Sequence, residues 1–322
     1  MLSRRHLLLG LAAAGFGSAR ANESFPDRAI KIVVPFPPGT ASEVFVRAIA
    51  DLLGARFAHP VVVENRPGGA GGTVGAAAVA NAEPDGHTLL ASPPGPLVTA
   101  AALYKGLGYN PADFVPVALL FESPQLLAVN PTVPARSLHE LVAFAKANPG
   151  KVAFASPGYG TQPHLLGEMF KATAGIDIVH VPYKGPANAV TDLLAGHVQM
   201  YFESSPLILP LVQSGRLKVL AAASDRRVPQ LPEVPTTAAG GFPGLRGGFW
   251  SGIVAPPRTP ASIVTVLNAA INSAMQAEGV KGALLKLGAE SRVGSPDEFR
   301  LFIAEETRKW SAIIKTAGLR ID

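Results

Sequence analysis

Short apolar runs alternate with helical patterns along most of the chain. Residues Ala29–Phe36 and Thr88–Ser92 are apolar almost throughout, as strands buried on both faces are. Between them, Ala41–Leu53 carries apolar side chains at helical spacing. Strands of this kind, each followed by a helix, favour an α/β fold with parallel sheets that helices cover on both faces.

The same two patterns predict the remaining elements. Further strands are expected at Pro60–Glu64, Lys151–Ser156, Ile176–Pro182, Val198–Glu203, Lys218–Ala223 and Phe249–Ala255. Further helices are expected at Gly72–Ala82, Ser137–Ala147, Pro163–Ala174, Ala187–Ala195, from Thr259 to about Ala277, and from Ser295 onward. Helices at a chain end often pack back on the first unit, so the chain would cross twice between two units at a hinge.

The first 21 residues predict a signal peptide that is cleaved near Ala21. Arg4 and Arg5 precede an apolar run, Leu7–Gly17, that is short for a membrane span. The pair of arginines also fits a twin-arginine export signal, and the two routes stay open. Either route exports the mature protein.

Composition narrows the classes of function. The chain has 322 residues, of which 16% are charged, and this suits two domains with their own cores. Cleavage removes three arginines and no acidic residue, so the formal net charge falls from +5 to +2. No stripe of basic residues predicts nucleic-acid binding, and no later window predicts stable membrane insertion. Without cysteine or paired histidines, neither a metal nor a cofactor is expected.

Two glycine-containing turns leave predicted strands and open predicted helices, at residues 33–44 (VVPFPPGTASEV) and 154–165 (FASPGYGTQPHL). Backbone N–H groups at a helix N-terminus favour an anion. Gly39, Gly158 and Gly160 would let the backbone approach a ligand closely. Hydroxyl donors are available at Thr40, Ser42, Ser156 and Thr161. One such turn from each domain, with the free amides of Gly39 and Gly160 facing each other across a cleft, would hold a carboxylate. Each turn taken alone is better explained as an ordinary helix cap.

The motifs typical of other classes of function are incomplete or absent in this sequence. The glycine-rich segment 64–76 lacks the third glycine of a dinucleotide fingerprint, because Val74 stands there, and no phosphate loop is present. No nucleophile elbow or H-E-x-x-H motif occurs. An enzyme acting on a small carboxylate and a structural protein remain as alternatives.

Together, these segments resemble the substrate-binding receptors of tripartite tricarboxylate transporters, the Bug-type or TctC-like periplasmic proteins. The motifs that carry the resemblance are VVPFPPGT at 33–40, VENRPGGAGG at 63–72, SPGYGTQPHL at 156–165, HVPYKGPANAVTDLLAGHVQ at 180–199 and LPEVPTTAAGGFPG at 231–244. The resemblance implies a type II periplasmic-binding-protein fold, with two lobes joined by two crossing strands. Domain I would comprise residues 22–124 and 246–322, and domain II residues 125–245.

The resemblance also implies a function. Such receptors close on a dicarboxylate, a tricarboxylate, an acidic amino acid or an aromatic acid and deliver it to membrane transporter subunits. In some relatives the partner is a sensor protein instead. Most act as monomers, and a monomer is expected here.

Site residues carry over from the two turns and from two later positions. The implied ligand contacts are Phe36, Gly39, Thr40, Ala41, Ser156, Gly158, Gly160, Thr161, His164, Tyr183 and Glu203. Glu203, if it faces the cleft, favours a ligand with an ammonium group. The chain departs from the family by having Thr40 after Gly39, where a second glycine is usual, and Glu43 in place of aspartate.

Overall fold

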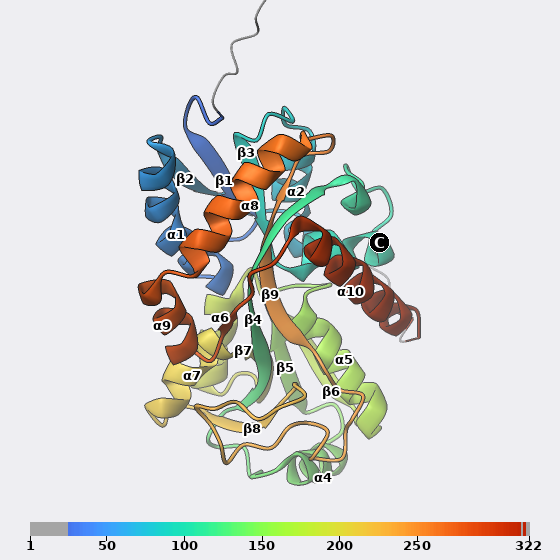
Figure 1. The fold of residues 1–322 in the computed structure, drawn as a ribbon. Coiled ribbons are helices and arrows are strands. Elements are labelled where there is room, and N and C mark those ends of the chain that lie inside the picture. Colours follow the sequence, from blue (N-terminus) through green and yellow to red (C-terminus); the bar gives the residue numbers. More distant parts are fainter. Residues whose placement is uncertain (1–24, 317, 320–322) are drawn as a thin grey trace, which may run out of the picture.

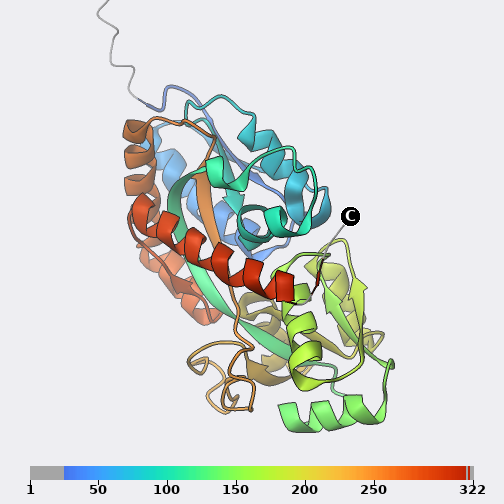
Figure 2. The ribbon, with the colours of Figure 1, turned by 90° about the vertical axis from the view of Figure 1, so that its right-hand side faces the viewer.

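Two α/β lobes lie end to end in the computed structural model, which describes residues 25–316, 318 and 319 (Figures 1 and 2). The predicted signal peptide, residues 1–21, lies outside the described residues. Strands of both lobes join in one ten-stranded sheet within the described part of the chain, along the order β2-β1-β3-β9-β4-β7-β5-β6. The expected α/β fold with two lobes is confirmed.

The first lobe is built on three parallel strands that the sequence predicts closely. These are β1 (Ile30–Val34), β2 (Val61–Asn65) and β3 (Thr88–Ser92), which β9 (Gly248–Ala255) joins in antiparallel orientation. Its helices are α1 (Ala41–Phe57), α2 (Thr73–Ala80), α3 (Ala100–Leu103), α8 (Ala261–Met275), α9 (Glu278–Lys286) and α10 (Pro296–Thr316). Short helical turns add η1 (Ala70–Gly72), η2 (Gly95–Thr99) and η3 (Pro111–Asp113).

The second lobe repeats the pattern with its own part of the sheet. Its strands are β5 (Val152–Ser156), β6 (Ile178–Pro182), β7 (Met200–Ser204) and β8 (Lys218–Ala222). Strand β5 runs parallel to β6 and β7. Its helices are α4 (Leu138–Ala147), α5 (Gln162–Ala174), α6 (Pro186–Ala195) and α7 (Ser205–Gln213).

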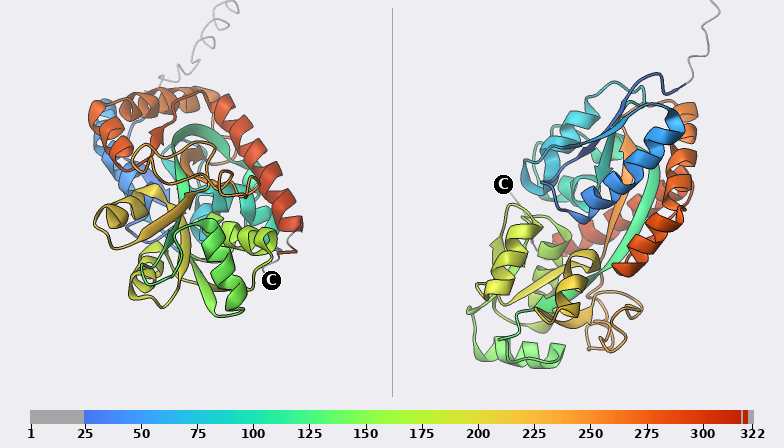
Figure 3. Two further views of the ribbon diagram at one scale, coloured as in Figure 1. Left: turned by 90° about the horizontal axis from the view of Figure 1, so that it is seen from below. Right: turned by 90° about the vertical axis from the view of Figure 1, so that its left-hand side faces the viewer.

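A long strand that the sequence analysis does not predict, β4 (Val115–Val129), belongs to both lobes (Figure 3). It pairs with β9 as far as Pro124 and with β7 from Gln125 onward. A two-residue strand, β10 (Glu290–Ser291), pairs with β4 on its first-lobe part. Strand β9 begins at this same crossing, where the Gln125 amide donates to the Gly247 carbonyl oxygen at 3.4 Å. Strands β4 and β9 therefore carry the chain between the lobes.

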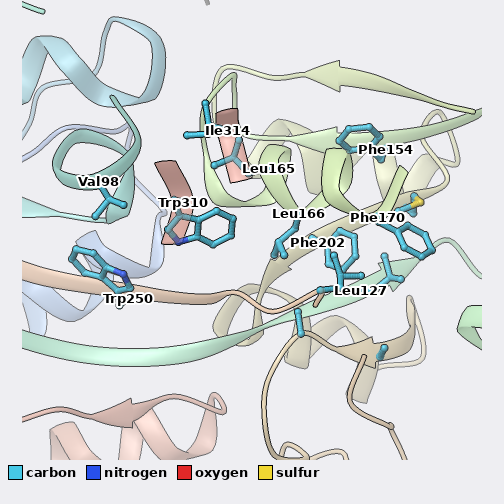
Figure 4. Close-up of a cluster of buried hydrophobic side chains, with 14 of the residues drawn as sticks. Val98, Leu127, Phe154, Leu165, Leu166, Phe170, Phe202, Trp250, Trp310 and Ile314 are labelled. Atoms are coloured by element: carbon cyan, nitrogen blue, oxygen red, sulfur yellow. The ribbon is translucent and has the colours of Figure 1, made fainter. Parts of the chain in front are cut away.

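Helix α10 of the first lobe also packs against α5 of the second. Trp310 and Ile314 on α10 share an apolar cluster with Leu165 and Leu166 on α5 (Figure 4). A side chain at Gly247 would meet both partners, because its Cβ would lie 3.1 Å from Leu166 and 3.2 Å from Trp310. The apolar core is thus continuous along one flank of the interlobe boundary.

Candidate functional site

A cavity of about 60 Å³ lies between the lobes, which is room for several water molecules. Both lobes contribute to its walls. The lining consists of Phe36, Thr40, Ala41, Ser42, Pro93, Pro94, Gly95 and Phe249 from the first lobe, and Pro157, Thr161, Gln162, Pro163, Pro186, Glu203, Ser204 and Leu207 from the second. No basic side chain occurs among these described lining residues.

Helices α1, α5, α6 and α7 all begin at this cavity. The Thr40 hydroxyl caps α1 by accepting from the Glu43 amide at 3.3 Å. The amides of Ala41 and Ser42 have no acceptor inside the helix, and none is found elsewhere in the described part of the chain. Such N-termini attract an anion through free amides and through the helix dipole.

Two buried side chains in the lining lack hydrogen-bond partners among the described residues. They are the Ser42 hydroxyl and both amide atoms of Gln162, and the two residues are only 2% and 3% exposed. Buried polar atoms in proteins almost always have a partner. Both residues stand in the first turn of a helix, beside the free amides. A ligand with carboxylate oxygens would give the hydroxyl and the amide NH₂ their missing acceptor.

Glu203 lines the second-lobe side of the cavity and is almost wholly buried. One of its oxygens accepts from the Ser204 backbone amide at 2.6 Å and from the Ser204 hydroxyl at 2.8 Å. The other accepts from the Tyr201 hydroxyl. Burial raises the pKa of Glu203 above its ordinary value, while the hydrogen bonds from Tyr201 and Ser204 oppose the rise.

The structure separates the predicted site residues into two groups. Those in the cavity wall are Phe36, Thr40, Ala41, Thr161 and Glu203. Those outside the wall are Gly39, Ser156, Gly158, Gly160, His164 and Tyr183.

The expectation that the amides of Gly39 and Gly160 are free to bind an acid group is wrong. The Gly39 amide donates to the Glu43 carboxylate at 3.1 Å, and the Gly160 amide donates to His164 Nδ1 at 3.1 Å. Both bonds connect residues four apart inside one turn. Each glycine amide is thus engaged within its own turn, and the residues that follow it line the cavity. The proposed binding of an acid therefore depends on groups two or three positions further along, at the helix N-termini.

The second turn rests on a pair of histidines, of which His164 is buried and His180 half-buried. The rings of His164 and His180 stack with centroids 4.1 Å apart, and His180 Nε2 lies 2.7 Å from the Ser156 hydroxyl. Burial lowers the pKa of His164 to about 4 and, together with the neighbouring His164, lowers that of His180 to about 3. Ser156 and His164 thus support the turn as neutral groups. Tyr183 lies apart from the cavity and donates to Asp192 at 2.7 Å.

Several lining residues were not among the predicted contacts. Gln162 and Pro186 open helices that begin one residue before the predicted starts at Pro163 and Ala187. The turn after β3, from Pro93 to Gly95, also lines the cavity. Its one signal in the sequence was its position at the carboxyl end of a predicted strand. Phe249 and Leu207 reach the cavity through the crossing strand and α7, and no local pattern marks them.

The described residues contain neither a candidate metal cluster nor a candidate membrane span. No three His, Asp or Glu side chains in that part of the chain are placed to hold a metal ion together. None of the helices described is both long and apolar enough to cross a membrane.

Comparisons with known proteins decide the family. The family model for the tripartite tricarboxylate transporter family receptor matches residues 45–319. The protein BugT of Bordetella pertussis is 38% identical over 313 residues, covering 97% of this chain and 96% of BugT. The chain belongs to this receptor family.

Solved structures of the family agree with the fold. A Rhodopseudomonas palustris protein solved with adipate is 33% identical, with a TM-score of 0.88 over 92% of this chain and 100% of that one. MatC from the same species, solved with bound malate, is 33% identical, with a TM-score of 0.85 over 90% and 100% of the two chains. As a member of the TctC family, the protein is a periplasmic solute-binding receptor and not an enzyme, and the resemblance seen in the sequence is confirmed.

Proposed function

We propose that this receptor captures a small carboxylate between its lobes and delivers it to a tripartite tricarboxylate-type transporter. The proposal depends mainly on Ser42 and Gln162, two buried side chains beside the N-termini of α1 and α5 that lack hydrogen-bond partners among the described residues. Hydroxyl and amide donors, together with free backbone N–H groups, match the acceptor oxygens of a carboxylate. Adipate and malate in the two relatives are ligands of this chemistry.

Closure of the lobes is the proposed means of capture. Residues 22–124 with 246–322 would move as one body and residues 125–245 as the other, about the crossings at Pro124–Gln125 and Gly247–Gly248. The exchange of β4 from one partner strand to the other at Pro124 supports a hinge there. The ligand would shift the equilibrium toward the closed form by its greater affinity for that form.

Export and partners complete the proposal. The mature chain would begin after Ala21 and act as a monomer in the periplasm. Its closed form would dock on membrane subunits of the transporter, with a sensor protein as the alternative partner. Sequencing the N-terminus of the exported protein would test the cleavage point.

A thermal-shift screen tests the proposed ligand class directly. Thermal unfolding of the mature chain would be followed in the presence of adipate, malate, acidic amino acids and aromatic acids, each added separately. Sugars and amines would serve as controls. An acid at 100 times its Kd should stabilise the fold by about 2.7 kcal/mol. If no acid raises the Tm while a sugar or an amine does, the carboxylate proposal is wrong.

A further inference from the structure

Glu203 brings an acidic group into a cavity that is otherwise built to receive an anion. It is the one ionisable residue among the described lining residues. It is 4% exposed, and no lysine, arginine or histidine described in the structure pairs with it within 4 Å. A buried carboxylate without a cationic partner is costly, and a nearby positive charge relieves that cost.

The neighbours of Glu203 favour its ionised form. All three hydrogen bonds to its oxygens come from donors, namely the Tyr201 hydroxyl and the Ser204 hydroxyl and amide. Glu203 also directly precedes the N-cap of α7, whose dipole favours a negative charge. The oxygen that accepts only from the Tyr201 hydroxyl retains capacity for a further donor.

A ligand with two carboxylates and no positive group would bring further negative charge beside Glu203, and like charges disfavour each other at such distances. A zwitterion fits both halves of the cavity. Its carboxylate would bind at the α1 and α5 N-termini with Ser42 and Gln162, and its positive group would lie against Glu203.

We propose that Glu203 binds the ammonium group of the ligand, an inference that rests on the proposed function. The receptor would then select amino acids over the matching acids without an amino group. Glu203 is then the residue that determines specificity at this site. Adipate and malate carry no ammonium group, so the preferred ligand of this receptor would differ from those of the two relatives solved with them.

Matched ligand pairs test this proposal by calorimetry at pH 7.5. The pairs are succinate with aspartate, glutarate with glutamate, and 3-phenylpropionate with phenylalanine, which differ within each pair only by the amino group. In a pair that binds, we expect the amino acid to bind at least tenfold more tightly. The Glu203→Gln variant should lose at least tenfold in affinity for the amino acid and bring the ratio within the pair close to one.

The ratio of the two affinities within a pair can be measured on the wild-type protein alone. Poor folding of Glu203→Gln would therefore leave that test intact. Equal or tighter binding of the acid without an amino group, or an amino acid affinity unchanged in Glu203→Gln, would overturn the proposal. If only adipate, malate or other plain acids bind, the role of Glu203 is wrong and the carboxylate receptor stands. If no acid of either kind binds, the carboxylate receptor itself is wrong.

Discussion

The hydroxyl of Thr99 in the first lobe donates a 2.8 Å hydrogen bond to the carbonyl oxygen of Gly160 in the second. Thr99 is buried, and its hydroxyl has a second acceptor, the Gly95 carbonyl oxygen, further away at 3.3 Å. A second bond joins the lobes nearby, from the Tyr104 hydroxyl to the Tyr159 carbonyl oxygen at 3.1 Å. The turn that Gly160 shapes is thus tied to the opposite lobe in this conformation.

We expect Thr99→Val to weaken ligand binding because it removes the donor and leaves the Gly160 carbonyl without it in the conformation where the lobes are joined. The loss should be about 1–3 kcal/mol, or roughly 5- to 150-fold in Kd. Calorimetric titration with the best acid of the screen would measure it. Tyr104→Phe is the matched control at the more exposed bond and should cost less. An affinity of Thr99→Val within twofold of wild type would show that this bond does not stabilise the closed form.

Gln162→Met should separate stability from binding. Methionine has a similar length and removes two buried polar atoms that have no partner among the described residues. The Tm of the free protein should therefore stay level or rise. The free energy of binding the acid should become less favourable by about 1–3 kcal/mol. Thermal unfolding and calorimetry on the same samples would check both. A fall in Tm with unchanged Kd would mean that Gln162 serves the fold and not the ligand.

The stacked histidines predict loss of stability in acid. Their pKa values in the folded protein, about 4 for His164 and about 3 for His180, lie below the ordinary value of 6.5. The unfolded chain therefore takes up protons first as the pH falls, and the folded state loses stability below about pH 6.5. Above that pH both rings are neutral in the folded and in the unfolded chain, so the folded state loses no stability through them.

A variant isolates this effect from the titration of carboxylates. His180→Gln keeps a polar group beside the Ser156 hydroxyl but does not titrate. The free energy of unfolding, measured with urea from pH 7 to 4.5, should fall more steeply in wild type than in the variant. Parallel curves would contradict the account of the histidine pair.

Most of the elements follow from local pattern, and the join between the lobes does not. The strand at Thr88–Ser92 has its expected bounds, because an apolar run between turn residues is a local signal. Strand β4 escapes such analysis because Glu122, Pro124 and Gln125 interrupt its apolar run where it changes lobes. Proline cannot donate to a ladder, and here Pro124 stands at the point where the pairing partner changes.

The site shows the same division. The sequence identifies both turns and the hydroxyl groups near the cavity, since glycines and helix caps are read locally. It does not show that Glu43 and His164 already engage the Gly39 and Gly160 amides, because those bonds depend on side-chain conformation. Nor does it show that Phe249 reaches the cavity, because that position is set by the long-range pairing of β9 with β4.

A pair of serine variants tests most directly whether the interlobe cavity holds the acid. Ser42 and Ser251 are both buried, and neither hydroxyl has a partner among the described residues, but only Ser42 lines the cavity. With the acid that gives the largest thermal shift, calorimetry should show a Kd raised roughly tenfold for Ser42→Ala, about 1.4 kcal/mol. Ser251→Ala should bind within twofold of wild type. Unchanged affinity in Ser42→Ala, or equal losses in both variants, would contradict ligand binding in this cavity.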